Sequence, residues 1–199
     1  MSEQLDDWRG EFGVAYTERN PLDWRTRVHA FTEMCGGLDI ESALEVGCNR
    51  GHNLQTFAEI LGPNARVEGV EPNPYARELA GEAQPAVRVI EGDIYALPVA
   101  DRSFDLVFTA GVLIHVPPEM LDAALAELDR VSRRFVLCVE YYAPAETEIV
   151  YRDRAGMLWK RDFAAEFATR LPQLTMIRSG YVGPDSGFDR SHWWLFERR

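Results

Sequence analysis

Short apolar runs alternate with amphipathic segments along most of the chain. Five of the apolar runs have the length of a buried β-strand and lie at residues 42–46, 66–70, 87–91, 104–109 and 135–139. The segments between them that repeat apolar residues at helical spacing lie at residues 52–61, 74–83 and from Pro118 onward. A helix near residues 160–170 and strands near residues 174–180 and 193–197 follow. This alternation predicts an α/β fold with a mainly parallel, seven-stranded sheet and helices on both faces.

The first 40 residues do not follow this rhythm. They are rich in aromatic and charged residues, including Trp8, Phe12, Tyr16 and Trp24. We expect one or two helices here, packed as a lid over the carboxyl edge of the sheet. The chain is therefore divided into an N-terminal helical cover (1–40) and an α/β domain (41–199), which together form a single structural unit.

The charge of the chain restricts its partners. The 199 residues include 21 Lys and Arg against 32 Asp and Glu, which gives a net charge of −11. So acidic a chain repels phosphate backbones, which argues against a nucleic-acid partner but not against small cationic or neutral ligands. No apolar run approaches the roughly 18 residues that span a bilayer, and the start lacks the features of a signal peptide. We expect a cytoplasmic protein without a membrane partner; an exposed sheet edge permits a homodimer without requiring one.

The cysteines and histidines give no sign of a metal site. Cys35, Cys48 and Cys138 show neither a CxxC pattern nor ligand spacing with histidine. An odd number of scattered cysteines argues against a disulfide framework and favours a reducing compartment. We therefore expect no metal cofactor.

A glycine-containing turn, EVGCNRG, follows the first strand from Glu45 to Gly51. The dinucleotide fingerprint GxGxxG would need glycine at two positions where this chain has Asn49 and His52. The pattern ExGxxxG instead resembles motif I of the class I S-adenosylmethionine (SAM) methyltransferases, whose middle glycine is replaced here by Asn49. Asn tolerates a left-handed backbone better than most residues, so we expect the turn to be kept.

The next strands also end in residues suited to an adenosine ligand, and open α/β sheets bind ligands outside these carboxyl ends. Glu71 can accept hydrogen bonds from both ribose hydroxyls. Asp93 can accept from the exocyclic amine of adenine, and Ile94 can cover the ring. By this resemblance we expect SAM to contact Glu45, Gly47, Cys48, Asn49, Gly51, Asn53, Glu71, Pro72, Asp93, Ile94, Thr109 and Gly111, with Tyr16 and Arg19 added from the cover.

A closer resemblance spans almost the whole chain. The segments WRGEFGVAYTERN, LEVGCNRG, GVLIHVPPE, EYYAP and KRDFAAEF together resemble the methylases associated with pseudaminic acid biosynthesis. That resemblance implies a Rossmann-like class I methyltransferase fold, SAM as methyl donor and a small-molecule acceptor. Related enzymes serve other small-metabolite pathways, and free L-arginine in natural-product biosynthesis is one candidate acceptor.

The residues after the fifth strand are candidates for binding the acceptor. A carboxylate at Glu140 can hold an amine or guanidinium and withdraw a proton as the nitrogen becomes nucleophilic. Tyr141 and Tyr142 can supply hydroxyl groups or a π-face for a cation. The alternative for Glu140 is an ion pair with an arginine such as Arg152 or Arg161.

Two further residues are candidates for catalysis beside Glu140. His115 can act as a base near neutral pH, or it can donate a hydrogen bond to a loop carbonyl. Tyr16, in the YTERN segment, is expected to approach the methyl group while Arg19 or a backbone amide meets the SAM carboxylate. Tyr151, with Arg152 and Arg161, is expected in the acceptor pocket, where the two arginines can bind an anionic group.

The sequence therefore favours a SAM-dependent methyltransferase for a small polar metabolite, with transfer to an amine or guanidino nitrogen preferred. The alternative within this class is N- or O-methylation of a nonulosonic or other amino sugar, with His115 as the base for a hydroxyl. More distant alternatives are a nucleotide-dependent oxidoreductase and a non-catalytic SAM-binding protein.

Overall fold

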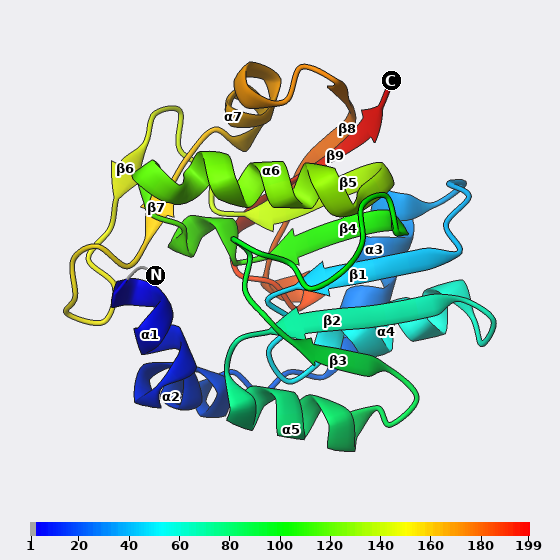
Figure 1. The fold of residues 1–199 in the computed structure, drawn as a ribbon, viewed down its shortest axis with the longest axis horizontal. Helices are drawn as coiled ribbons and strands as arrows, with labels where there is room; N and C mark the ends of the chain where they lie inside the picture. The colour runs from blue at the N-terminus through cyan, green and yellow to red at the C-terminus, as the bar shows by residue number, and fades with distance from the viewer. Residues whose placement is uncertain (1–2) are drawn as a thin grey trace.

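The computed structural model describes residues 3–199, whose centre is a seven-stranded sheet in the order β3-β2-β1-β4-β5-β9-β8 (Figure 1). The strands are β1 (Ser42–Val46), β2 (Arg66–Glu71), β3 (Arg88–Glu91), β4 (Phe104–Ala110), β5 (Ser132–Glu140), β8 (Leu174–Val182) and β9 (Ser191–Arg198). β9 runs antiparallel to both of its neighbours, whereas β1 to β5 pair in parallel. The predicted mainly parallel, seven-stranded α/β sheet is confirmed.

Helices cover both faces of this sheet because successive side chains of a strand point to opposite faces. On one face, α3 (Val28–Cys35) and α4 (His52–Leu61) pack an aromatic core against the strands, which includes Phe31, Phe57 and Phe108. On the other face, α6 (Leu121–Val131) and α7 (Phe163–Arg170) bury their apolar stripes. A further helix, α5 (Pro74–Ala83), packs along β2 and β3. The continuous apolar runs of the central strands are explained by this burial on both sides.

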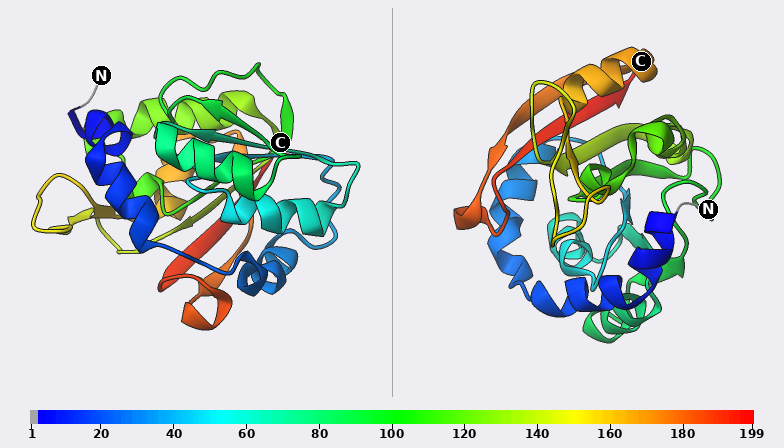
Figure 2. Two further views of the ribbon diagram at one scale, coloured as in Figure 1. Left: turned by 90° about the horizontal axis from the view of Figure 1, so that it is seen from below. Right: turned by 90° about the vertical axis from the view of Figure 1, so that its left-hand side faces the viewer.

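The N-terminal segment forms a shorter cover than expected. Over the carboxyl end of the sheet lie α1 (Glu3–Arg9) and α2 (Glu11–Arg19), which curve around this end in Figure 2, right. The 3-10 turn η1 (Trp24–Arg27) then leads to α3, which belongs to the helix layer beside α4. The expectation that all of residues 1–40 cover the carboxyl edge of the sheet was therefore wrong for α3. The apolar face of this helix packs into the core against the sheet, where Phe31 and Met34 are fully buried.

The starts of two helices also differ from the predicted ones. The helix expected from Pro118 begins with the 3-10 turn η3 (Pro118–Met120) and becomes α-helical at Leu121. The helix expected near residue 160 is preceded by a small hairpin of β6 (Thr147–Glu148) and β7 (Trp159–Lys160). Two further 3-10 turns are present. η2 (Leu113–His115) follows β4, and η4 (Pro184–Ser186) precedes β9. Within residues 3–199, no helix is long and apolar enough to cross a membrane.

Candidate active site

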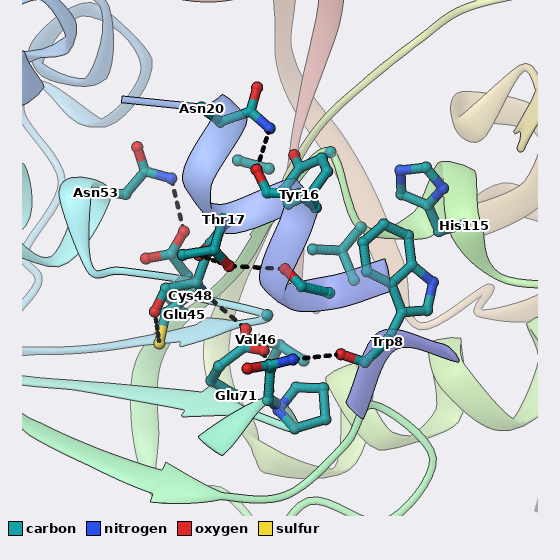
Figure 3. A pocket seen from close by; sticks show the side chains of 18 of the residues that line it. Trp8, Tyr16, Thr17, Asn20, Glu45, Val46, Cys48, Asn53, Glu71 and His115 are labelled. Carbon is teal, nitrogen blue, oxygen red and sulfur yellow. Dashed lines mark hydrogen bonds between the residues drawn. The ribbon is translucent and has the colours of Figure 1, made fainter. Parts of the chain in front are cut away.

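A cavity of about 430 Å³ lies at the carboxyl ends of β1 to β4, beneath α1 and α2 (Figure 3). Strand ends, the lid helices and the loop after η4 all contribute to its lining. Twelve of the predicted site residues meet there: Tyr16, Glu45, Gly47, Cys48, Asn49, Asn53, Glu71, Pro72, Asp93, Ile94, Gly111 and His115.

The turn after β1 has the tight conformation that its glycines predict. Gly47, Asn49 and Gly51 all have left-handed backbones, with φ of 76°, 47° and 78°. Asn49 thus occupies the position of the missing glycine, as its tolerance of this region predicts. A side chain at Gly47 would also place its Cβ only 2.6 Å from Val112 Cγ2. The turn consequently brings the backbone itself to the cavity wall.

A chain of polar contacts runs from Glu45 to the loop after η4. Glu45 is only 2% exposed, and its Oε1 accepts a hydrogen bond of 2.6 Å from Asn53 Nδ2. Asn53 Oδ1 in turn accepts from Arg27 at 2.7 Å. Arg27 also donates to Gly187 O and lies 4.1 Å from the centre of the Phe188 ring. Two cavity-lining segments far apart in the sequence are joined in this way.

The second carboxylate oxygen of Glu45, Oε2, is buried and has no hydrogen-bond partner. Burial raises the pKa of Glu45 to about 8, although Asn53 and Arg27 lower it. An unpartnered buried acceptor costs about 1–3 kcal/mol. Glu45 lines the cavity, and its carboxyl is thus a polar group there that the protein itself satisfies only in part.

Glu71 closes the end of β2 and is held by the backbone. Its two oxygens accept hydrogen bonds of 2.9 Å from the N–H groups of Asn49 and Asn73. Burial raises its pKa, and these two N–H groups oppose the rise. A carboxylate has about four lone-pair positions, so Glu71 keeps acceptor capacity for a ligand.

Asp93, at the end of β3, is engaged by the lid. Its Oδ2 pairs with Arg9 at 2.9 Å, and its Oδ1 accepts from the Tyr95 N–H at 2.9 Å. Asp93 is one of the residues that line the cavity. The carboxylate is thus oriented in the cavity wall by one cation and one backbone amide.

The lid helices are tied to the strand ends by Asn73 and Thr17. The side-chain amide of Asn73 donates to three carbonyls in the turn between α1 and α2, those of Trp8, Arg9 and Gly10. Thr17 donates to Asn49 Oδ1 at 2.8 Å, which links α2 to the turn after β1 (Figure 3). The lid and the glycine turn therefore form one hydrogen-bonded wall.

His115 faces the cavity from η2 in a defined tautomer. Its Nδ1 lies 2.6 Å from Met157 O, and a carbonyl can only accept, so Nδ1 carries the proton. Its Nε2 is then an acceptor. Burial lowers the pKa of His115 to about 4, and its ring packs 4.6 Å from Trp8 and 5.3 Å from Tyr151. The structure thus contains the carbonyl hydrogen bond that was one of the two expectations for this residue.

Glu140 lies beneath the cavity and not in its wall, which corrects the expected contact with an acceptor. Its Oε1 accepts from the Thr109 hydroxyl and from the N–H groups of Val112 and Leu113. Its Oε2 accepts from the Ile114 N–H, and the side chain is fully buried. The reason is that buried backbone N–H groups need acceptors, and the start of η2 would otherwise lack them.

Arg161 makes the complementary contacts and is also displaced from the expected pocket. It is fully buried, donates to the carbonyls of Leu113 and Val116, and pairs with Glu146 at 2.9 Å. Glu140 and Arg161 therefore bind the two ends of the same turn without forming the direct ion pair considered as the alternative. The predicted site residues that do not line the cavity are Arg19, Gly51, Thr109, Glu140, Tyr141, Tyr142, Tyr151, Arg152 and Arg161.

Comparison with known proteins agrees with this geometry. The family model described as a methyltransferase domain matches residues 43–134. A 37.1 kDa uncharacterized protein in a Streptomyces fradiae transposon is 43% identical over 96 residues, covering 47% of this chain and 27% of that protein. An uncharacterized methyltransferase of Schizosaccharomyces pombe is 34% identical over 134 residues, covering 59% of this chain and 46% of that protein. The chain thus spans half or less of the length of these curated relatives.

Solved structures extend the likeness to the whole fold. The magnesium protoporphyrin IX methyltransferase of Synechocystis, solved with S-adenosylhomocysteine (SAH), has a TM-score of 0.73 at 17% identity and covers 98% of both chains. The fold is that of the SAM-dependent methyltransferases. In this methyltransferase fold the glycine turn after β1 and the strand ends form the cavity described above.

Several residues that build the cavity of this methyltransferase fold were not predicted from the sequence. They include Gln4, Leu5, Trp8, Gly13, Thr17, Arg27, Asn73, Tyr95, Phe188 and Asp189. The aromatic character of the first residues was a signal for Trp8. No motif marked Arg27 or Asp189, since each reaches the cavity through tertiary packing. The described residues contain no cluster of His, Cys, Asp and Glu that could hold a metal ion.

Proposed function

We propose that this protein is a SAM-dependent methyltransferase that acts on a small polar metabolite, preferentially at an amine or guanidino nitrogen. The observation that carries the proposal is the cavity bounded by the glycine turn and the carboxyl ends of β1 to β4, with the side chains of Glu45, Glu71 and Asp93 in its lining. The α-ammonium group of SAM is proposed to donate to the Glu45 carboxyl, whose Oε2 the protein leaves without a partner. The resemblance to methylases associated with pseudaminic acid biosynthesis supports a small-molecule acceptor.

The remaining lining residues fit the other parts of SAM. Arg27, beside Asn53, is the group proposed for the methionine carboxylate, in place of the exposed Arg19. Glu71 is proposed for the ribose hydroxyls, because its carboxylate lies buried at the end of β2. Asp93 and Ile94 are proposed for the adenine amine and ring face.

Bound SAM supplies a methyl group already activated on a sulfonium, so the protein must position an acceptor atom and exclude water. The lid supplies the exclusion, since Trp8 and Tyr16 lie over the cavity in edge-to-face contact with centroids 5.3 Å apart. Burial keeps His115 neutral, so its Nε2 is proposed to accept a hydrogen bond from an N–H or O–H of the acceptor and thereby orient the atom that is methylated. Glu140 and Arg161 are assigned to holding the turn that carries His115.

One observation favours a second candidate, O-methylation of a sugar or other hydroxylated acceptor. The tautomer of His115 leaves the Nε2 lone pair available to a hydroxyl proton. The same geometry serves an amine, so the preference for nitrogen depends on the charge of the cavity. An N- or O-methylated amino sugar is the acceptor class of this alternative.

A turnover screen with methyl-labelled SAM, read by mass spectrometry, tests the proposal. The acceptors are free amino acids including L-arginine, amino sugars and nonulosonic acids. Labelled N-methyl product supports the first candidate, and a labelled ether supports the second. SAM binding without labelled product from any acceptor contradicts catalysis and favours the non-catalytic SAM-binding alternative; nicotinamide-nucleotide binding without SAM binding favours the oxidoreductase.

A substitution tests the proposed cofactor site independently of the acceptor. Glu71→Ala is expected to weaken SAM binding by about 1–3 kcal/mol, because the ribose hydroxyls lose their acceptor. Glu91→Ala is the matched control: this glutamate also ends a strand, but its side chain is 77% exposed outside the cavity. Isothermal titration calorimetry measures both. Equal affinities in the two variants would contradict the assigned ribose contact.

A further inference from the structure

The carboxylates of the cavity fall into two groups. Glu45, Glu71 and Asp93 lie at the ends of β1 to β3, and the proposed function assigns them to SAM. The fourth lining carboxylate, Asp189, comes from the loop between η4 and β9 and has no part in that assignment. Among the described lining residues, Arg27 is the only lysine or arginine. Asp93 is paired with an arginine of α1, and burial raises the pKa values of Glu45 and Glu71. Asp189 is therefore the exposed acidic group of the lining that the proposed function leaves without a role.

Asp189 has a fixed position and makes no direct ion pair with a residue of the range 3–199, although Arg27 is near enough to interact with its charge. The Tyr141 hydroxyl donates a hydrogen bond of 2.6 Å to its Oδ2. Its Oδ1 accepts no hydrogen bond from a residue of that range. Arg27 is already bonded to Gly187 O and Asn53. One carboxylate oxygen at the exposed mouth of the cavity is thus free for a ligand.

Aromatic residues surround this mouth. Tyr16 lines the cavity, and its hydroxyl makes no hydrogen bond with a described residue. Burial is the main cause that raises the pKa of Tyr16 to about 12. Tyr151 and Asp189 add to this rise. Burial and Asp189 likewise raise the pKa of Tyr141. Both tyrosines therefore keep their protons, and the rings of Tyr16 and Trp8 offer π-faces that attract cations.

We propose that Asp189, oriented by Tyr141, binds a cationic guanidinium group of the methyl acceptor. This inference rests on the proposed function and names the group that selects its substrate. An anionic acceptor would lie against the negative charge of Asp189, and a neutral acceptor would leave its free oxygen without a charged partner. The role that the sequence suggested for Glu140 passes to Asp189, because Glu140 is saturated by backbone donors beneath the cavity.

Calorimetry on the SAH-loaded protein tests this inference with two probes of similar shape. L-Arginine carries a guanidinium, and L-citrulline replaces it with a neutral urea. Arginine is expected to bind about tenfold or more tightly than citrulline, and Asp189→Asn is expected to abolish most of this difference. The asparagine keeps an acceptor for the Tyr141 hydroxyl, so the variant removes charge with little change of shape.

A matched control separates this effect from the general charge of the loop. Asp185→Asn removes an exposed carboxylate from η4, which is outside the cavity lining. It is expected to leave arginine binding within about twofold of the original, the range for an exposed charge. Tyr141→Phe is expected to give an intermediate loss, since Asp189 keeps its charge but loses the hydrogen bond that orients it.

The outcomes of the test are distinct. Equal binding of arginine and citrulline, no binding of arginine at millimolar concentration, or equal effects of the two aspartate variants would each overturn the inference. Failure of SAH to bind would instead overturn the proposed function, and arginine binding to the chain without SAH would then still decide the role of Asp189. Arginine that binds through Asp189 but is not methylated would leave the subsite standing and reject this acceptor.

Discussion

Two buried glutamates, each at the carboxyl end of a strand of the sheet, differ in how their carboxyl oxygens are hydrogen-bonded. Glu45, at the end of β1, has one oxygen bonded to Asn53 and one with no partner. Glu140, at the end of β5, receives four hydrogen bonds from the Thr109 hydroxyl and three backbone N–H groups. Both are nearly or fully inaccessible, and burial raises the pKa of both, to about 8 and about 7.

A position at the end of a strand therefore does not by itself identify a carboxylate as ligand-binding. The donors around Glu140 come from η2, so this charge stabilises local backbone. Oε2 of Glu45 has no donor, and Glu45 lines the cavity, so we propose that a bound ligand completes this carboxyl. Substitution of Glu45 should therefore change mainly the cofactor affinity, and substitution of Glu140 should change mainly the free energy of unfolding.

The largest expected effect is on the cofactor affinity of Glu45→Gln. Burial raises the pKa of Glu45 to about 8, and an ammonium bound beside this carboxyl favours its charged form, which a neutral amide cannot adopt. Hydrogen bonds to charged groups contribute about 1.5–3 kcal/mol. SAM affinity should fall roughly 10- to 150-fold while the chain still folds, as measured by calorimetry and circular dichroism. An unchanged dissociation constant would contradict the assignment of the orphaned oxygen.

The next effect is on the stability of Glu140→Gln. The new amide would point N–H groups toward at least one backbone donor, so we expect the free energy of unfolding to fall by about 1–3 kcal/mol. Chemical denaturation measures this fall, and SAM affinity is expected to change by less than about twofold. A collapse of SAM affinity without loss of stability would place Glu140 in the cofactor site after all.

A smaller effect concerns the pH dependence of stability. The folded pKa values of Glu45 and Glu140 lie above their ordinary value of 4.5. Each therefore favours folding fully below about pH 4.5, and this contribution is lost as pH rises through about 7 for Glu140 and about 8 for Glu45. Denaturation at a series of pH values should show a shallower fall in stability above pH 4.5 in each glutamine variant, and the change should extend to about pH 8 for Glu45→Gln and to about pH 7 for Glu140→Gln.

His115 provides the control on the acid side of the same profile. Its folded pKa of about 4 lies below the ordinary 6.5, so its contribution is complete above pH 6.5 and is lost as pH falls toward 4. His115→Gln should flatten only this acid limb. An unchanged profile between pH 4 and 6.5 in this variant would contradict the effect of burial on His115.

The sequence predicted the parts of the site that lie on regular strand ends. Glu71 and Asp93 reach the cavity because parallel strands bring their carboxyl ends to one edge. Asn49 fits its turn because its own left-handed backbone is a local property. The predictions for Glu140 and Arg161 were wrong in placement, because nothing in the local pattern showed that η2 would need a buried anion at one end and a buried cation at the other.

The sequence by itself determined the α/β alternation, the glycine turn and the carboxylates at the ends of β1 to β3, since these depend on hydrophobic period and local backbone preference. Only the tertiary structure decided which polar atoms are satisfied. Arg27 meets a carbonyl 160 positions away, and Asp189 enters the cavity through the loop before β9. Such placements depend on packing between distant segments, and so the acceptor end of the site could be found only in the folded chain.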